Sequence, residues 1–291
     1  MNDRLFILLQ HLAPKEWLTH AAGRLASTDR PWVAQRFIRW FIQRYQVDMS
    51  EALHSDPAHY RDFNAFFTRE LRPGVRPLSD AHWLCPVDGR VSQLGGIQQG
   101  QLIQAKGRSY SLSALLASPE QAEGFAQGHF ATLYLSPRDY HRIHMPCDGR
   151  LLSMHHIPGD LFSVNPVTAE GVEGLFARNE RLVCWFEGPF GRFAMVLVGA
   201  TIVGSIATVW SGVVTPPRHS RTVRNWDYTC PNTAPICLAK GAEMGRFQLG
   251  STVIMVMPGH APLQFNPAWQ AGQAIRMGED MAQMPAAAVQ P

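Results

Sequence analysis

The sequence predicts an α+β fold, in which N-terminal amphipathic helices are followed by a mainly antiparallel β core. Two observations support this class. Apolar residues recur at helical spacing in the first part of the chain, and beyond Pro77 they form short runs separated by Gly and Pro. We therefore expect a helical region over residues 1–47, a core over residues 48–278, and a flexible tail rich in Met, Ala and Pro over residues 279–291.

Three helices are expected within residues 1–47. The first ends at Pro14, the second contains Trp17 and Leu18, and the third starts near Pro31. The expected apolar positions of the third helix are Val33, Phe37, Trp40 and Phe41, and its polar positions are Arg36, Arg39 and Gln43. The region contains seven Lys or Arg against three Asp or Glu. Such helices either pack on the protein's own core or lie in a membrane interface, and the sequence leaves both open.

A fourth helix is expected from Tyr60 to Leu71, and a series of strands follows it. The expected strands cover residues 89–94, 102–105, 130–135, 150–155, 182–187, 193–198, 202–209 and 252–257. Two segments are similar to each other: P-V-D-G-R-V at residues 86–91 and P-C-D-G-R-L at residues 146–151. Because Asp-Gly is a common turn sequence, the similarity indicates either two similar turns or two related β units in one core.

The composition is typical of a folded protein and argues against several functions. Of the 291 residues 46% are hydrophobic and 17% charged, and the net charge of +3 is too small to indicate a nucleic-acid partner. No apolar run reaches the roughly 18 residues of a transmembrane helix, and no secretory signal with a small-residue cleavage site is recognised. The five cysteines are scattered without a C-x-x-C pair, as expected for reduced cytosolic thiols.

The candidate nucleophile is Ser251. It follows Gly250 and precedes the apolar run 253–257, which places its hydroxyl at the entry to an expected buried strand. Gly250 permits a strained backbone and close approach of another group to its carbonyl. The electrophile nearest to an activated Ser251 is therefore the Gly250–Ser251 peptide bond itself. Taken alone, Gly-Ser-Thr is also an ordinary turn composition.

An activated serine needs a base, and the base needs an orienting acid. His141 and His144 are the densest candidates for the base. Asp88 and Asp148 occupy equivalent places in the two similar segments, so the residues alone do not decide between them as the acid. Neither histidine has the carboxylate or cysteine partners of a zinc site at a suitable spacing, so no metal is expected.

Four motifs, taken together and in order, carry a resemblance to a known family. They are F-N-A-F-F-T-R-E-L at 63–71, P-V-D-G at 86–89, Y-H-R-I-H-M-P at 140–146, and K-G-A-E-M-G-R-F at 240–247 leading into L-G-S-T at 249–252. The chain resembles the phosphatidylserine decarboxylases of the pyruvoyl-dependent bacterial type, whose bacterial and mitochondrial-type members carry the L-G-S-T form.

The resemblance implies that Asp88, His144 and Ser251 form a protease-like relay acting on the chain's own Gly250–Ser251 bond. Cleavage would leave chains of 250 and 41 residues (291 − 250 = 41), the smaller capped by a pyruvoyl group derived from Ser251. An α-keto amide is an electron sink, so a Schiff base with the substrate amine would let the carboxylate leave. His141 is then the candidate for decarboxylation or reprotonation, or alternatively a structural neighbour.

The same resemblance implies the substrate, the partners and the location. The substrate would be phosphatidylserine in its membrane, and the products phosphatidylethanolamine and CO2 for phospholipid biosynthesis. The two cleaved chains would remain together as a heterodimer and pair further into a homodimer. Because no transmembrane span is expected, the enzyme would be peripheral, on the cytoplasmic face of the bacterial inner membrane.

Two other classes of protein share part of this pattern. A Ser-His-Asp hydrolase acting on an external ester usually carries its serine in a G-x-S-x-G elbow between strand and helix, whereas Ser251 precedes a strand. A non-catalytic membrane-binding module would use residues 1–47 and merely retain the fold. An intact 291-residue mass would identify the hydrolase, and loss of lipid decarboxylation on replacing Ser251 would exclude the module.

Overall fold

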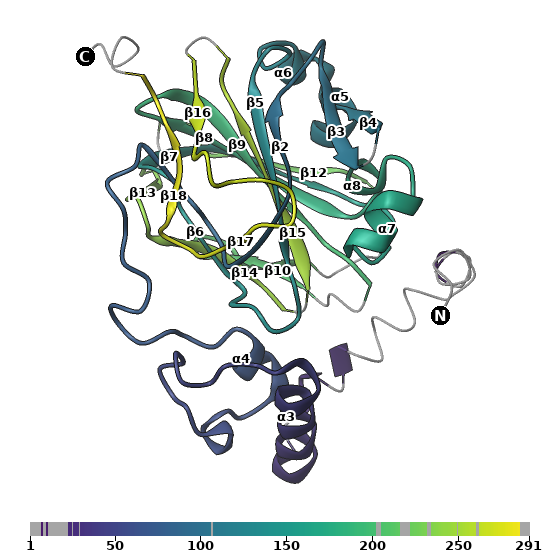
Figure 1. Cartoon of the computed structure of the whole chain (residues 1–291), viewed down its shortest axis with the longest axis vertical. Coiled ribbons are helices and arrows are strands. Elements are labelled where there is room, and N and C mark those ends of the chain that lie inside the picture. Colours follow the sequence, from purple (N-terminus) through teal and green to yellow (C-terminus); the bar gives the residue numbers. More distant parts are fainter. Residues whose placement is uncertain are drawn as a thin grey trace.

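The computed structural model describes much of the chain (Figure 1). The described residues are 7, 10, 23, 24, 26–28, 30–105, 107–201, 205–215, 222–231, 234–248, 250–259 and 262–285. The first two expected helices lie largely outside these residues, as does the part of the expected tail beyond residue 285. Within the described part, a few helices accompany mostly antiparallel sheets, which confirms the α+β class.

The third expected helix is α3, Pro31–Tyr45, which has Pro at its start and a left-handed residue, Gln46, at its C-cap. Its buried face consists of Ala34, Ile38 and Phe41. Of the expected apolar positions Phe41 is buried, Val33 and Phe37 are half-buried, and Trp40 is 51% exposed. The reason is geometric: Ala34, Ile38 and Phe41 follow the i, i+4, i+7 positions of one stripe, and Trp40 lies beside that stripe.

A short helix, α4, packs with α3 and forms a small aromatic cluster with it. It covers only Phe63–Phe67 instead of the expected Tyr60–Leu71, because the Asp62 side chain accepts a hydrogen bond from Ala65 N (2.8 Å) and sets its start. The Thr68 hydroxyl bonds the Asn64 carbonyl at its end (2.8 Å). A 3₁₀ turn, η1 (Pro57–His59), precedes it. The buried members of the cluster are Ala26, Ile38, Phe41, Val47, Tyr60, Phe63, Phe66 and Phe67.

A nine-stranded antiparallel sheet forms the centre of the fold. Its order is β12-β7-β8-β9-β15-β5-β2-β17, with β13 paired beside β7. The strands are β2 (Gly89–Gly96), β5 (His129–Leu135), β7 (Gly149–Ile157), β8 (Arg181–Gly188), β9 (Gly191–Val198), β12 (Arg224–Asp227), β13 (Cys237–Leu238), β15 (Ser251–Met257) and β17 (Ala274–Ile275). Six of the expected strands are therefore confirmed within this sheet.

Smaller sheets and short helices cover the large sheet. One sheet has the order β11-β10-β14-β6, another β1-β18-β16, and β3 pairs with β4. Their strands are β1 (Trp83–Leu84), β3 (Gln101–Ala105), β4 (Arg108–Ser111), β6 (Arg142–His144), β10 (Ile206–Thr208), β11 (Gly212–Thr215), β14 (Glu243–Phe247), β16 (Gln264–Phe265) and β18 (Asp280–Gln283). The helices are α5 (Leu112–Leu116), α6 (Pro119–Glu123), α7 (Pro166–Gly171) and α8 (Leu175–Arg178).

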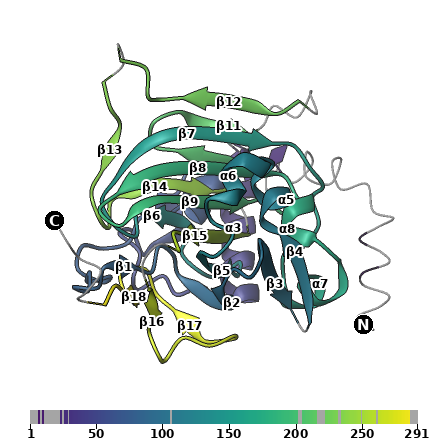
Figure 2. The ribbon, with the colours of Figure 1, turned by 90° about the horizontal axis from the view of Figure 1, so that it is seen from above.

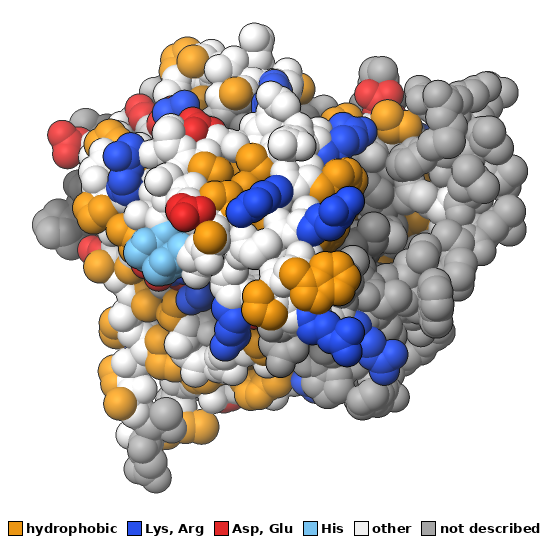
Figure 3. Space-filling view, turned by 90° about the horizontal axis from the view of Figure 1, so that it is seen from below, with side chains coloured by type: hydrophobic (Ala, Val, Ile, Leu, Met, Phe, Trp, Pro, Cys, Tyr) orange, Lys and Arg blue, Asp and Glu red, His pale blue; other side chains and the backbone are white. Residues whose placement is uncertain are grey.

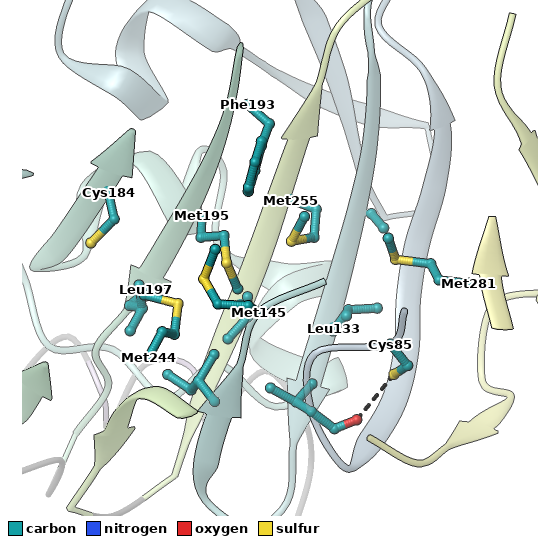
Figure 4. Packing of buried hydrophobic residues seen from close by; sticks show 14 of the residues in the cluster. Cys85, Leu133, Met145, Cys184, Phe193, Met195, Leu197, Met244, Met255 and Met281 are labelled. Carbon is teal, nitrogen blue, oxygen red and sulfur yellow. Dashed lines mark hydrogen bonds between the residues drawn. The ribbon is translucent and has the colours of Figure 1, made fainter. Parts of the chain in front are cut away.

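The two faces of the large sheet carry two hydrophobic clusters. Figure 2 shows α5, α7 and α8 on one side of the curved sheet and β6 and β14 on the other. Along the central strand β15, Val253, Met255 and Met257 enter the cluster under β6 and β14, while Ile254 and Val256 enter the cluster under the helices. Methionine side chains fill much of the first cluster (Figure 4). Its buried methionines are Met145, Met154, Met195, Met244, Met255, Met257, Met281 and Met284.

The two similar segments belong to two related β units. His144 N donates to Pro86 O (2.9 Å), and at the matching place Leu84 N donates to Pro146 O (2.8 Å). Further equivalent bonds join Gly278 N to Cys85 O, Gly241 N to Met145 O, Val91 N to Gln273 O and Leu151 N to Ile236 O, all at 2.9 Å. Of the two interpretations left open by the sequence, related β units rather than two similar turns account for this exchange.

The expected flexible tail is wrong for residues 279–285. Asp280–Gln283 form β18, which pairs with β1 on one side and β16 on the other. Met281 and Ala282 are fully buried. Composition alone predicted a loose segment here, but two strands distant in sequence provide its hydrogen-bond partners.

Candidate active site

Ser251 is the first residue of β15 and pairs with Leu135, the last residue of β5. It is fully buried. Two segments leave this end of the sheet. One continues from β5 through residues 136–141 into β6, and the other joins the start of β15 at Ser251 to the end of β14 at Phe247. Because β6 and β14 also pair with each other, both segments lie over the same end of the sheet.

This arrangement brings the histidine motif beside the serine motif. His141 O accepts a hydrogen bond from Phe247 N (3.0 Å), four residues before Ser251. His144 pairs with Glu243 across β6 and β14. Asp88 immediately precedes β2, whose Arg90 pairs with Tyr134 near the same end of β5. The sequence-predicted residues therefore gather at one end of the sheet, from three separate segments.

The Ser251 hydroxyl is buried and has no hydrogen-bond partner within the described residues, and the same holds for the Thr252 hydroxyl beside it. Leaving a buried hydroxyl unpaired costs about 1–3 kcal/mol, so such a group is a marker of function rather than of stability. Ser205, the other serine that follows a glycine, is also buried, but its Oγ donates to Thr215 O. Only Ser251 of this pair has a hydroxyl free to react.

Gly250 does not use the backbone freedom that a glycine permits. Its φ is not in the left-handed region, and a Cβ built on it would meet no heavy atom within 4 Å. The fold therefore does not require glycine here for its conformation, and the space that a side chain would occupy is open.

His144 is a neutral base, and the lone pair on its Nε2 already accepts a hydrogen bond. Its Nδ1 lies 2.8 Å from Gly241 O, so Nδ1 carries the proton and donates to that carbonyl. Its Nε2 accepts a hydrogen bond from the Tyr140 hydroxyl at 3.0 Å. Burial lowers the pKa of His144 below its ordinary value of 6.5, which keeps the ring neutral at pH 7.

His141 is also neutral, but its lone pair has no partner. Its Nδ1 donates to Asp139 O (2.8 Å), and its ring packs on Phe67 with centroids 4.1 Å apart. Nε2 is buried and unpaired among the residues the structure describes. Complete burial lowers the pKa of His141 to about 3. The site thus contains two unpaired reactive atoms, Ser251 Oγ and His141 Nε2.

The structure distinguishes the two candidate acids. Asp88 is 7% exposed, and Arg76 donates to its Oδ1 through Nε (3.0 Å) and to its Oδ2 through Nη2 (2.5 Å). Arg76 also bonds Glu51 (2.6 Å), which lowers the pKa of Glu51. Asp148 is exposed and accepts only from Lys240 N (2.7 Å). Asp88 is therefore the buried carboxylate of the site.

The proposed relay is not hydrogen-bonded in this conformation. No hydrogen bond within the described ranges joins Asp88 to His144 or His144 to Ser251. Two residues of the site were not predicted from the sequence. They are Tyr140, whose hydroxyl bonds His144 Nε2, and Arg76, which donates hydrogen bonds to the Asp88 carboxylate. Tyr140 stands in the quoted histidine motif and could have been proposed from it. Arg76 had no such signal. Among the described residues no group of three His, Cys, Asp or Glu side chains could hold a metal ion.

The chain is similar to known proteins over nearly its whole length. The profile of the family "Phosphatidylserine decarboxylase" matches residues 63–283, and a second profile, "PSD", matches residues 5–46. A phosphatidylserine decarboxylase proenzyme of Chromobacterium violaceum is 61% identical over 284 residues, 97% of this chain and 100% of that protein. One of Polaromonas naphthalenivorans is 58% identical over 287 residues, 98% of this chain and 99% of that protein. The chain belongs to the phosphatidylserine decarboxylase family.

Proposed function

We propose that Ser251 cleaves the Gly250–Ser251 bond of its own chain and that its residue becomes a pyruvoyl group. The observation that carries the proposal is the Ser251 hydroxyl, which is buried, unpaired and one residue from the Gly250 carbonyl. Family membership supports it, because the relatives are named proenzymes. The protein is accordingly a phosphatidylserine decarboxylase made as a proenzyme, which converts phosphatidylserine to phosphatidylethanolamine and CO2.

The cleavage can be written with the residues present. His144 Nε2 takes the proton of Ser251 Oγ once the Tyr140 hydroxyl has moved away, and the oxygen attacks the Gly250 carbonyl. The amide becomes an ester between the two residues. Loss of the Ser251 Cα proton breaks the Cβ–O bond, leaving the Gly250 carboxylate and a dehydroalanine. The dehydroalanine tautomerises to an imine, and water hydrolyses the C=N bond, which releases ammonia and leaves the pyruvoyl ketone.

The surroundings of Ser251 suit the chemistry of such a group. A pyruvoyl carbonyl supplies an electron sink when it is conjugated to a substrate amine. The chain's own contribution is to keep that position dry and to keep two neutral imidazoles near it, because burial lowers the pKa of both His141 and His144. His141, whose Nε2 is not engaged elsewhere, is proposed to hold or transfer a proton during decarboxylation.

The enzyme is proposed to work at the membrane surface, on the cytoplasmic face. No helix of the described residues is long and apolar enough to cross a membrane. The end of the molecule formed by α3 and α4 shows hydrophobic and basic side chains side by side (Figure 3). Trp32 and Trp40 are 71% and 51% exposed there, on the same helix as Arg36 and Arg39. Aromatic and basic side chains of this kind bind anionic lipid surfaces.

The partners are proposed on the same basis. Because β15 lies between β9 and β5, both of which precede the cleavage point, the smaller chain stays within the sheet after cleavage. The product is therefore a heterodimer of the chain's own two parts, and by family resemblance a further homodimer, without nucleic acid.

The proposed function is tested with purified protein and phosphatidylserine vesicles. Wild-type protein should produce phosphatidylethanolamine and CO2, and Ser251→Ala should produce neither. Ser205→Ala is the matched control, because it also removes a buried serine hydroxyl that follows a glycine, and it should retain activity. Decarboxylation by Ser251→Ala at the wild-type rate would refute the assignment.

A further inference from the structure

One buried cation of the fold has no carboxylate partner. Arg69 is 4% exposed, and its Nε and Nη1 have no hydrogen-bond partner in the described part of the chain. Its only side-chain hydrogen bond to the described residues runs from Nη2 to Arg138 O (3.1 Å), and its guanidinium lies over the Phe66 ring, 5.5 Å from the ring centroid. Arginine remains protonated in proteins, so a full positive charge is held out of water with two of its donor groups unused.

Another buried arginine shows that unpaired guanidinium donors are not a general feature of this fold. Arg181 is 3% exposed and likewise lacks a carboxylate, yet Nε, Nη1 and Nη2 donate to the carbonyls of Leu115, Asn179 and Ala114 at 2.6, 3.0 and 2.6 Å. A buried guanidinium can therefore be satisfied by the backbone. The unused donors of Arg69 indicate a ligand that is not part of the chain.

Arg69 lines a cavity of about 340 Å³, and the cavity reaches the active site. Asp88 and Tyr140 line the same cavity, and Tyr140 bonds His144. The cavity is also lined by five carboxylates, those of Asp48, Glu51, Asp88, Asp139 and Glu279, and each accepts a hydrogen bond from another residue. Asp48 accepts from Ser50 N (2.8 Å) and Glu279 from Arg276 N (3.0 Å). Asp88 and Glu51 bind Arg76, and Asp139 accepts from both the backbone and the hydroxyl of Ser136 (2.7 Å each). None of them forms an ion pair with Arg69 among the described residues.

We propose that Arg69 binds the phosphate oxyanion of the lipid headgroup and so positions the serine moiety against the reacting centre. The inference rests on the proposed function. The headgroup has two anions, and the reaction decides between them. A carboxylate held by a buried guanidinium would be stabilised in the ground state and would lose that stabilisation on leaving as CO2. The phosphodiester keeps its charge throughout, so binding it helps the substrate without opposing the reaction.

The test uses short-chain phosphatidylserine dissolved as monomers, so that vesicle binding does not enter. Arg69→Gln keeps much of the side-chain volume and removes the charge. It should raise KM by about 10- to 100-fold, the loss expected for charge-assisted hydrogen bonds, with a smaller effect on kcat. Arg69→Lys should restore part of the loss. Arg61→Gln is the matched control, because Arg61 is 83% exposed at the side chain and lies outside the cavity lining.

Competition experiments on the wild-type enzyme identify the anion without a variant. Glycerophosphoglycerol, a phosphodiester with neither amine nor carboxylate, should compete with the substrate and should bind Arg69→Gln about 10-fold more weakly or worse. Inorganic phosphate and free serine are tested as competitors in the same way. Inhibition by inorganic phosphate as strong as that by the phosphodiester would show a free-phosphate site and overturn the proposal. Stronger competition by serine alone would overturn it in favour of the carboxylate.

The remaining outcomes separate this inference from the proposed function. A self-cleaved wild-type protein that does not decarboxylate the lipid refutes the function. An active wild type with an unchanged KM in Arg69→Gln refutes the anion site alone. If Arg69→Gln does not fold, the wild-type competition decides, and absence of competition by glycerophosphoglycerol refutes the site.

Discussion

Replacing Tyr140 by Phe should speed self-cleavage. In the structure the Tyr140 hydroxyl donates to His144 Nε2 at 3.0 Å, while His144 Nδ1 is held by Gly241 O. If His144 is the base, this hydroxyl must leave before Nε2 can take the proton of Ser251. The substitution removes the competing donor and leaves the ring contact and the bond to Gly241.

The size of the effect follows from that one hydrogen bond. A neutral hydrogen bond contributes about 0.5–1.5 kcal/mol net, so its removal should raise the cleavage rate by roughly 2- to 10-fold. Burial raises the pKa of Tyr140 above its ordinary value. The hydroxyl is therefore protonated over the working pH range, and the acceleration should not depend on pH near neutrality.

The assay is a pulse of cell-free synthesis followed by measurement of the uncleaved fraction over time. Tyr228→Phe is the control, because it removes an exposed tyrosine hydroxyl that bonds Ser211 (3.0 Å) instead of a residue of the site. An unchanged rate in Tyr140→Phe would refute the reasoning and point to His141, whose Nε2 has no donor to displace. A slower rate would show that the hydroxyl orients His144 for the reaction.

Three further predictions concern the acid, the buried histidine and the membrane face, the first two measured in a Ser251→Ala background by urea unfolding. Asp88→Asn leaves Arg76, 6% exposed, with Glu51 alone and should cost about 3 kcal/mol of stability, whereas Asp148→Asn should cost far less; equal losses would contradict the burial argument. The pKa of His141 is lowered from 6.5 to about 3, so the unfolded state binds the extra proton between these values. Stability should fall as pH falls through that window by up to about 1.4 kcal/mol per pH unit, and His141→Gln should lack this part of the slope. Trp40→Ser should weaken binding to anionic vesicles by about 10-fold without slowing self-cleavage, and undiminished binding would place the lipid contact elsewhere.

Most of the β core was predictable because its strands are buried runs with clear boundaries. The central strand β15 is apolar on both faces and is bounded by Gly250 and Pro258, which local reasoning recognises. The strand β18 was missed because its partners, β1 and β16, are short and distant in sequence. Pairing of this kind is a tertiary effect that composition does not reveal. The start of α4 was misjudged for a local reason, the capping hydrogen bond of Asp62.

The candidate site was predictable as a set of residues but not as a geometry. Motif spacing and family resemblance selected Asp88, His141, His144 and Ser251, and the fold gathers them at one end of the sheet. The hydroxyl that bonds His144 Nε2 depends on side-chain directions, which residue spacing does not predict. The choice of Asp88 over Asp148 likewise depends on burial, since the two lie in equivalent positions of the related β units.

The intact mass of the purified protein tests the central claim most directly. Wild-type protein should resolve into chains of 250 and 41 residues (291 − 250 = 41), and the smaller should have a blocked N-terminus and gain mass on borohydride treatment. Ser251→Ala should remain one chain of 291 residues, and Ser205→Ala should be cleaved like the wild type. A single uncleaved wild-type chain, or a small chain with a free serine amino group, would contradict the account.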